Sequence, residues 1–294
     1  MITNKCNQSC AHCVSNSYGQ YSEELEYDAL INALVSINNN LRDFAITLVG
    51  GEATIWPRFY DLLKSSEFRG IKNKMLYTNA TALNDERIIA IRDAGFYEVR
   101  VSIDSDRKDE HDDLRGNGTF DKTLDAVQKM ISAGIPVSSA TVLKKSNVKR
   151  IGDIVQLMKS LGIKMMHLIP LYFNGRGFIA KDCALTPDDY RILVEKLQSE
   201  YSDIFRRRSP LCTSGTAYFR IECNGDCNIQ QGRERQLLGN IYNDDFSVLY
   251  DSAIRRFSPA IFHCENCSCY TSPILCENMY SYCLADLKLI DETE

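Results

Sequence analysis

Short runs rich in β-branched residues alternate with amphipathic segments through the first 170 residues of this 294-residue chain. The alternation predicts strands at residues 44–49, 74–78, 98–103, 137–142 and 165–169. Helices are predicted between them at residues 84–94, 120–133 and 148–161, and each is followed by a glycine. A glycine there suits the left-handed residue that ends a helix. Strands alternating with helices of this length predict a parallel α/β sheet, either doubly wound or closed into a barrel.

Three cysteines lie within the first thirteen residues, at Cys6, Cys10 and Cys13, with the spacing C-x3-C-x2-C. Three thiolates on one short loop can ligate three irons of a cubic iron–sulfur cluster, which leaves the fourth iron without a protein ligand. Clusters held for electron transfer normally have four cysteine ligands. The open iron is therefore a place where a small molecule can bind and react.

The twelve cysteines of the chain are unevenly distributed, since three precede residue 14 and eight lie between Cys212 and Cys283. No signal peptide and no apolar stretch of eighteen residues is present, so we expect a cytoplasmic protein without a membrane span. In a reducing cytosol, clustered cysteines are metal ligands more often than disulfides. The net charge of −5 provides no basic surface for nucleic acid or an anionic membrane.

The strand and helix alternation stops near Pro170, which predicts a domain boundary. Residues 1–180 are expected to form the α/β domain, and residues 181–208 a linker with a helix that begins at Thr186-Pro187. Residues 209–294 have short segments, many turn residues and eight cysteines. A domain this small has little hydrophobic core, so metal coordination would have to stabilise it.

Further motifs follow the predicted strands in a fixed order: Gly50-Gly51-Glu52, Thr78-Asn79, Val101-Ser102-Ile103-Asp104, His111-Asp112-x2-Arg115-Gly116 and Gly175-Arg176. With the cysteine motif, they resemble those of the radical S-adenosylmethionine (SAM) enzymes over nearly the whole chain. The resemblance is greatest to the subgroup with a C-terminal SPASM or twitch extension. It implies a partial (β/α)6 parallel barrel followed by a small cysteine-rich domain. Met1 precedes Cys6 by five residues, so the barrel's first strand is expected to be short or to lack its start.

The resemblance also implies roles for individual residues. Cys6, Cys10 and Cys13 would hold the [4Fe–4S] cluster whose open iron binds SAM. The Gly50-Gly51-Glu52 loop would bind the amino group of SAM, and Arg115 its carboxylate, because a guanidinium makes planar two-point contacts. The remaining polar residues of the implied SAM site are Ser102 and Asp104 for the ribose, Thr78 and Asn79 for further contacts, and His12 near the adenine.

A purely structural role remains open for each of these SAM contacts. A plain turn between strand and helix is the alternative for Gly50-Gly51-Glu52. His111 and His263 are expected at the surface, and His167 within a strand.

Cysteines of the C-terminal region resemble the ligands of an auxiliary [4Fe–4S] cluster in a twitch domain: Cys212, Cys227, Cys264 and Cys267. The remaining Cys223, Cys269, Cys276 and Cys283 could hold a second cluster, although their spacing departs from the SPASM pattern. Alternatively, Cys223 or Cys269 could donate a hydrogen atom to a substrate radical. By spacing alone, the C-x2-C pair also suits structural zinc.

The activity that the resemblance implies is reductive cleavage of SAM to a 5′-deoxyadenosyl radical, which abstracts a hydrogen atom from an unactivated C–H bond. An electron donor such as a flavodoxin or ferredoxin would be the partner. The favoured substrate is a ribosomally made peptide that is epimerised, cross-linked or oxidised. The alternatives are dehydrogenation or epimerisation of a sugar or aminocyclitol and, more remotely, a non-catalytic iron–sulfur module.

Overall fold

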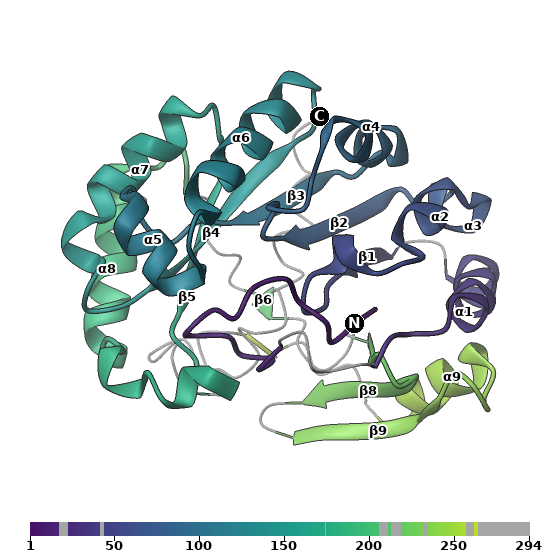
Figure 1. The fold of residues 1–294 in the computed structure, drawn as a ribbon. Helices are drawn as coiled ribbons and strands as arrows, with labels where there is room; N and C mark the ends of the chain where they lie inside the picture. The colour runs from purple at the N-terminus through teal and green to yellow at the C-terminus, as the bar shows by residue number, and fades with distance from the viewer. Residues whose placement is uncertain are drawn as a thin grey trace.

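The computed structural model describes residues 1–17, 23–41, 44–173, 175–205, 211–212, 219–231, 234–256 and 262–263. Its main sheet is parallel, with the strands in the order β1-β2-β3-β4-β5 (Figure 1). The strands are β1 (Ala45–Leu48), β2 (Asn73–Thr78), β3 (Glu98–Ser102), β4 (Val137–Leu143) and β5 (Met166–Pro170). The predicted parallel α/β architecture is confirmed, and each strand agrees with its prediction to within one residue at either end.

Helices connect the strands and pack mainly on one side of the sheet (Figure 1). The α-helices of the first two thirds of the chain are α1 (Tyr27–Asn40), α2 (Phe59–Lys64), α3 (Ser66–Arg69), α4 (Asp85–Ala94), α5 (Lys108–Arg115), α6 (Thr119–Ser132), α7 (Ile151–Ser160) and α8 (Pro187–Glu200). Short 3-10 turns are η1 (Ala53–Ile55), η2 (Val148–Arg150), η3 (Gly175–Phe178) and η4 (Lys181–Cys183). The glycines predicted to follow three helices, Gly95, Gly134 and Gly162, all have positive φ.

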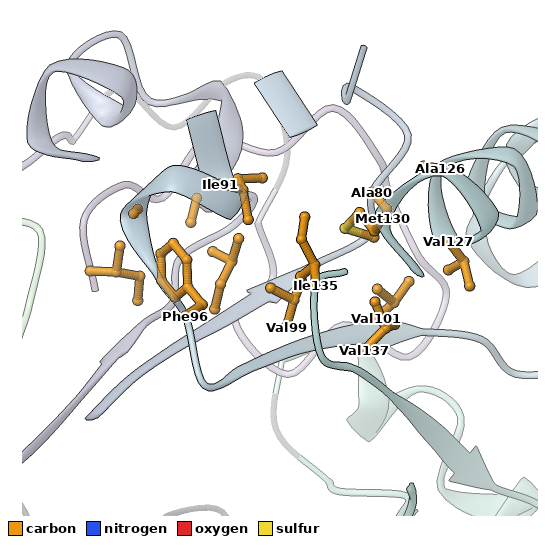
Figure 2. Close-up of a cluster of buried hydrophobic side chains, with 14 of the residues drawn as sticks. Ala80, Ile91, Phe96, Val99, Val101, Ala126, Val127, Met130, Ile135 and Val137 are labelled. Atoms are coloured by element: carbon orange, nitrogen blue, oxygen red, sulfur yellow. The ribbon is translucent and has the colours of Figure 1, made fainter. Parts of the chain in front are cut away.

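The hydrophobic core lies between the sheet and these helices. Val99 and Val101 of β3 are fully buried against α4 and α6, as Figure 2 shows. Phe96 and Met130 fill the space between the helices and the strands. Burying such a side chain contributes about 1.5–3 kcal/mol relative to leaving it exposed, so this layer fixes the sheet on which the site is built.

The alternate residues of β3 are charged and buried on the opposite, inner face of the sheet. Arg100 Nε donates to Glu98 Oε1 at 2.7 Å, and His167 Nε2 of β5 lies 3.2 Å from the same oxygen. The Ser138 hydroxyl also donates to Glu98, and Arg100 donates to the Tyr77 hydroxyl. Burial by itself raises the pKa of Glu98, but His167 and Arg100 outweigh it and lower that pKa to about 2.

The described C-terminal residues pack against the start of the chain (Figure 1). Strands β7 (Phe219–Ile221), β8 (Asp226–Gln231) and β9 (Glu234–Asn240) form an antiparallel sheet, followed by α9 (Phe246–Arg256). The amino group of Met1 donates to the carbonyl of Ile221, and Ser36 of α1 donates to Asp245 Oδ1 at 3.2 Å. Strand β6 (Leu211–Cys212) pairs with β10 (Phe262–His263). No helix in the described ranges is long and apolar enough to cross a membrane.

Glu98, Arg100 and His167, here called the charged layer, predict a loss of stability in acid. Because the folded pKa of Glu98 lies below its ordinary value of 4.5, its ionised form contributes stability at neutral pH. That contribution, about 3 kcal/mol, is lost as the pH falls from about 5 to about 2. We expect the free energy of unfolding to fall more steeply over this range in the parent than in Glu98→Gln, measured by denaturant titration. The exposed control Glu86→Gln should follow the parent, and equal slopes for parent and Glu98→Gln would contradict the assignment.

Candidate functional site

The loop with the first three cysteines, residues 6–13 and here called the cluster loop, starts at the carboxyl edge of the sheet. Residues 2–5 lie beside the chain that leaves β1 and run in the same direction. Ile2 N donates to Val49 O at 2.9 Å, and Gly51 N donates to Thr3 O at 2.8 Å. Glu52 N donates to Lys5 O at 2.8 Å. This segment takes the sixth place beside the five described strands and delivers Cys6 to the edge.

Gly50 and Gly51 allow the two segments to approach this closely. A Cβ atom on Gly51 would lie 2.1 Å from the carbonyl oxygen of Lys5. A Cβ atom on Gly50 would lie 2.7 Å from the carbonyl oxygen of Thr3. Side chains at either position would therefore push away the segment that carries the cluster loop.

Glu52 joins the glycine loop to the end of β2 and is almost fully buried. Its Oε1 accepts hydrogen bonds from Thr54 N at 3.1 Å, Thr54 Oγ1 at 2.6 Å and Thr78 Oγ1 at 2.7 Å. Its Oε2 accepts one, from Asn79 N at 2.7 Å. Burial raises the pKa of Glu52, although these bonds oppose the shift. A carboxylate has about four acceptor positions, divided between its two oxygens, so Oε2 retains room for a further donor.

Asp104, just beyond β3, is a second buried carboxylate and lies on the other side of the cluster loop from Glu52. Its Oδ2 accepts from Arg115 Nε at 2.8 Å and lies 3.2 Å from His12 Nε2. Its Oδ1 accepts from Val142 N at 2.8 Å. Burial opposes ionisation, but Arg115 and His12 hold the pKa of Asp104 well below its ordinary value. The carboxylate thus binds the cluster loop, α5 and β4 together.

Polar side chains from both the Glu52 side and the Asp104 side of the edge approach the cluster-loop cysteines. Asn79 Nδ2 donates to Asn7 Oδ1 at 2.9 Å and lies 4.0 Å from Cys6 Sγ. Arg115 Nη1 lies 3.9 Å from Cys10 Sγ. Burial raises the pKa of Cys6 to about 12, with the neighbouring thiols Cys10 and Cys13 adding to the increase.

Arg176 of η3 holds the cluster loop from a third direction. Its backbone N–H donates to Cys13 O at 2.9 Å, and its Nε donates to Cys10 O at 2.7 Å. Its Nη1 and Nη2 donate to Asn16 Oδ1 at 3.1 Å and Ser17 O at 2.9 Å. The adjacent Gly175 has φ +56°, and a Cβ atom there would lie 2.5 Å from Cys13 O. One residue therefore fixes both ends of the Cys10–Cys13 turn and the segment after it.

The other residues named from sequence are more scattered. Ser102 ends β3 on the same face as Asp104 and is half-buried. Cys227 is fully buried in β8, and Cys223 is buried with its thiol 3.6 Å from Glu23 Oε2. Cys212 is described for its backbone, which pairs with Phe262 two residues before Cys264. Five of the predicted cysteines lie outside the described residues: Cys264, Cys267, Cys269, Cys276 and Cys283.

The expectation that His111 lies at the surface is wrong. His111 is fully buried on α5, its ring 5.4 Å from that of Phe120, and its Nδ1 is 3.5 Å from the backbone N of Asp104. The prediction failed because α5 turns this residue under the Asp104 loop rather than towards solvent.

Comparison with known proteins agrees with this arrangement. The family model described as the radical SAM superfamily matches residues 1–158, which is more than half of the chain. This chain belongs to the radical SAM superfamily.

Relatives of this radical SAM chain include proteins named for maturation. The sporulation killing factor maturation protein SkfB of Bacillus subtilis is 32% identical over 188 residues, covering 62% of this chain and 44% of that protein. The mycofactocin maturase MftC of Mycobacterium tuberculosis is 26% identical over 223 residues, covering 73% and 56%. The AdoMet-dependent heme synthase of Methanosarcina barkeri is 31% identical over 226 residues, covering 75% and 62%. The chain thus spans 44% to 62% of the length of these relatives.

Two solved structures share the radical SAM fold. The structure of anSMEcpe with bound AdoMet has a TM-score of 0.69 at 18% identity and covers 94% of this chain and 86% of that one. Streptococcus suis SuiB bound to its precursor peptide SuiA has a TM-score of 0.72 at 15% identity and covers 93% and 68%. At this identity the likeness establishes the fold.

Radical SAM proteins use a [4Fe–4S] cluster together with SAM, and the residues at this edge fit that pair. Within the described ranges, no three His, Cys, Asp or Glu side chains converge on a single metal ion. A cubic cluster differs because it takes each thiolate at a separate iron. Metal ligation requires deprotonated thiols, and the Arg115 guanidinium beside Cys10 offsets the charge that the thiolates then carry.

Sequence reasoning missed two side chains at this edge. Arg176 was noted only as part of a motif, although the glycines on either side of it indicated close backbone packing. Lys144, the residue after β4, had no motif to reveal it. Its burial beside Asp104 follows from the pairing of β3 with β4.

Replacing Arg176 tests its hold on the cluster loop. In Arg176→Met, the carbonyls of Cys10 and Ser17 lose charge-assisted hydrogen bonds, each worth about 1.5–3 kcal/mol. We expect a chelator to remove iron from the reconstituted variant about tenfold faster or more, measured by absorbance. Arg176→Lys should rescue this only partly, because one ammonium cannot reproduce the guanidinium's spread of donors. The exposed control Arg107→Met should match the parent, and an unchanged rate in Arg176→Met would exclude the role.

Proposed function

We propose that this chain is a radical SAM enzyme that abstracts a hydrogen atom from an unactivated C–H bond in a peptide or protein substrate. One observation carries the proposal: Glu52 and Asp104, two buried carboxylates of opposite pKa shift, flank a three-cysteine loop at the carboxyl edge of a parallel sheet. Ligands bind at this edge in parallel α/β folds. The relatives SkfB and MftC, both named as maturation proteins, favour a peptide.

The chain's own residues have distinct tasks in this proposal. When bound, the cluster and SAM supply reductive cleavage to a 5′-deoxyadenosyl radical. Glu52 Oε2 accepts the ammonium of SAM, while Thr54 and Thr78 hold Oε1 in place. Arg115 is oriented by Asp104 and presents its remaining Nη2 donors towards the carboxylate of SAM. Ser102 and Asn79 border the same space from β3 and β2, and His12 contributes the adenine side.

A small molecule is the second candidate substrate. The heme synthase relative covers more of this chain than SkfB does, at similar identity. The sugar or aminocyclitol expected from a compact C-terminal region belongs to the same broad class. An electron donor such as a flavodoxin or ferredoxin, and an auxiliary cluster on Cys212, Cys227, Cys264 and Cys267, complete the proposal. The pairing of β6 with β10 supports that set, since Cys212 is opposite Phe262, which precedes Cys264 by two positions in the sequence.

Glu52→Gln tests the ammonium contact. The substitution keeps the size of the side chain but removes its charge and brings an amide N–H₂ towards the donors that the carboxylate accepts. We expect SAM to bind about tenfold more weakly or worse, and folding stability to fall by about 1–3 kcal/mol. Equilibrium dialysis with parallel iron analysis measures both binding and cluster content. Glu86→Gln is the exposed control, and unchanged SAM affinity with full iron content would remove Glu52 from the cofactor site.

Anaerobic reconstitution tests the chemistry as a whole. About eight irons per chain indicate one auxiliary cluster and about twelve indicate two. The Cys6/Cys10/Cys13 triple alanine variant should lose about four irons and should form no 5′-deoxyadenosine when reduced with SAM. The exposed Cys183→Ala serves as the matched control and should keep all its iron. A parent protein that binds iron but yields no 5′-deoxyadenosine would instead be a non-catalytic iron–sulfur module.

A further inference from the structure

Lys144 is a buried cation that the proposed chemistry does not use. It directly follows β4, its residue is 3% exposed, and its Nζ makes no hydrogen bond within the described part of the chain. The next residue shows the contrast, since Lys145 is exposed and its Nζ donates to Asp182 O at 3.0 Å. The two neighbouring lysines therefore differ, because the side chain of Lys145 is exposed to solvent and that of Lys144 is buried.

The surrounding structure holds Lys144 in this position. Its backbone N–H donates to Asn147 Oδ1 at 2.9 Å. The amide nitrogen of Asn147 donates in turn to Asp104 O at 3.0 Å and to Val142 O at 2.8 Å. The backbone that carries the amine is thus tied both to the chain that leaves β3 and to β4.

Asp104 is near Lys144 but does not pair with it. Arg115, His12 and the backbone of Val142 already occupy the carboxylate of Asp104. Lys144 forms no ion pair with it within 4.0 Å. Two buried cations, Arg115 and Lys144, therefore lie near the one carboxylate of Asp104.

A buried charge without a partner destabilises the folded chain, so an anionic group that completes the pair would bind tightly. Lys144 provides three donors on a compact ammonium and no acceptor, which suits a carboxylate oxygen. The chain itself supplies no such oxygen to Lys144 among its described residues. A bound ligand is one source of such an oxygen.

The charges around Lys144 indicate which ligand. Burial lowers the pKa of Lys144, and the groups that act on it are Asp104, Arg115, Cys183 and Asp113. His12 of the cluster loop also lies close enough to Lys144 for their charges to interact. The backbone N–H of Lys145 donates to Cys183 O of η4 at 2.9 Å, so the segment after β4 passes beside η4. SAM has a single carboxylate, which the proposed function assigns to Arg115 beside Cys10, so a carboxylate for Lys144 would come from the substrate.

We propose that Lys144 anchors a carboxylate of the substrate at the carboxyl edge between β3 and β4, and so selects an acidic substrate. This inference rests on the proposed function, since it assumes that substrate binds at the edge that holds SAM. For a peptide, the carboxylate is either an acidic side chain or the C-terminal group.

The test compares Lys144→Met with Lys145→Met in reconstituted protein. Without ligand, Lys144→Met should unfold at a higher temperature than the parent, because it removes a buried unpaired charge. Lys145→Met should match the parent. A lower unfolding temperature for Lys144→Met would show that the ammonium has a partner in the folded chain and would overturn the proposal.

Ligand binding supplies the second measurement, with SAM present at saturation. The probes are acetyl-Gly-Glu-Gly-amide for a side-chain carboxylate, acetyl-Gly-Gln-Gly for a terminal one, and acetyl-Gly-Gln-Gly-amide as the neutral blank. At least one acidic probe should raise the unfolding temperature of the parent and of Lys145→Met, with about tenfold weaker binding to Lys144→Met. Which acidic probe does so identifies the source of the carboxylate. The same response in all three proteins, or in none, would overturn the proposal.

The affinity for SAM alone separates substrate from cofactor. We expect equal dissociation constants for the parent and both lysine variants, measured by equilibrium dialysis. Selective weakening in Lys144→Met would assign the amine to SAM and overturn the substrate role. None of these measurements needs turnover, so a failure of the radical chemistry, seen as absent 5′-deoxyadenosine, is distinguishable from a failure of this inference.

Discussion

Three main-chain hydrogen bonds between residues 2–5 and the chain leaving β1 determine where everything else at the carboxyl edge lies. They form because Gly50 and Gly51 offer no side chain where the carbonyls of Thr3 and Lys5 must pass. This backbone contact places Cys6 at the sheet edge and turns Glu52 inward towards β2. Gly50 and Gly51 therefore allow two segments of the chain to pack closely, and this packing shapes the proposed cofactor site.

Charge compensation completes the edge. Arg115 approaches the sulfur of Cys10 from α5, and Arg176 binds the carbonyl of the same residue from η3. Arg115 lies in the segment after β3 and Arg176 in the segment after β5, so the observed form of the cluster loop requires both strands. Three thiolates on one loop repel one another, and two fixed guanidinium groups lessen that repulsion. Cluster assembly and folding of the core are consequently linked.

The repeating local patterns were predictable, because apolar spacing and helix-ending glycines act over a few residues. The ends of each predicted strand lie within one residue of the observed ends, and the predicted helix that begins at Thr186-Pro187 is α8, with Thr186 as its cap. The partners of Asp104 were not predictable, since strand alternation showed which face it occupies but not that His12 and Arg115 converge on it. The same limit explains His111, which α5 buries, and Lys144, whose environment depends on three separate segments. Pairings across long sequence separations decide which polar side chains remain available to a ligand.

The charged layer on the inner face of the sheet limits how far an apolar group can enter from the carboxyl edge. Arg100 lies two residues before Ser102 on β3, and its pairing with Glu98 extends to Ser138 on β4 and His167 on β5. Such a layer is a floor, since pushing an apolar group through it would strip ionised partners from one another. An apolar group that entered from the carboxyl edge would therefore stop above Arg100, near the level of Ser102.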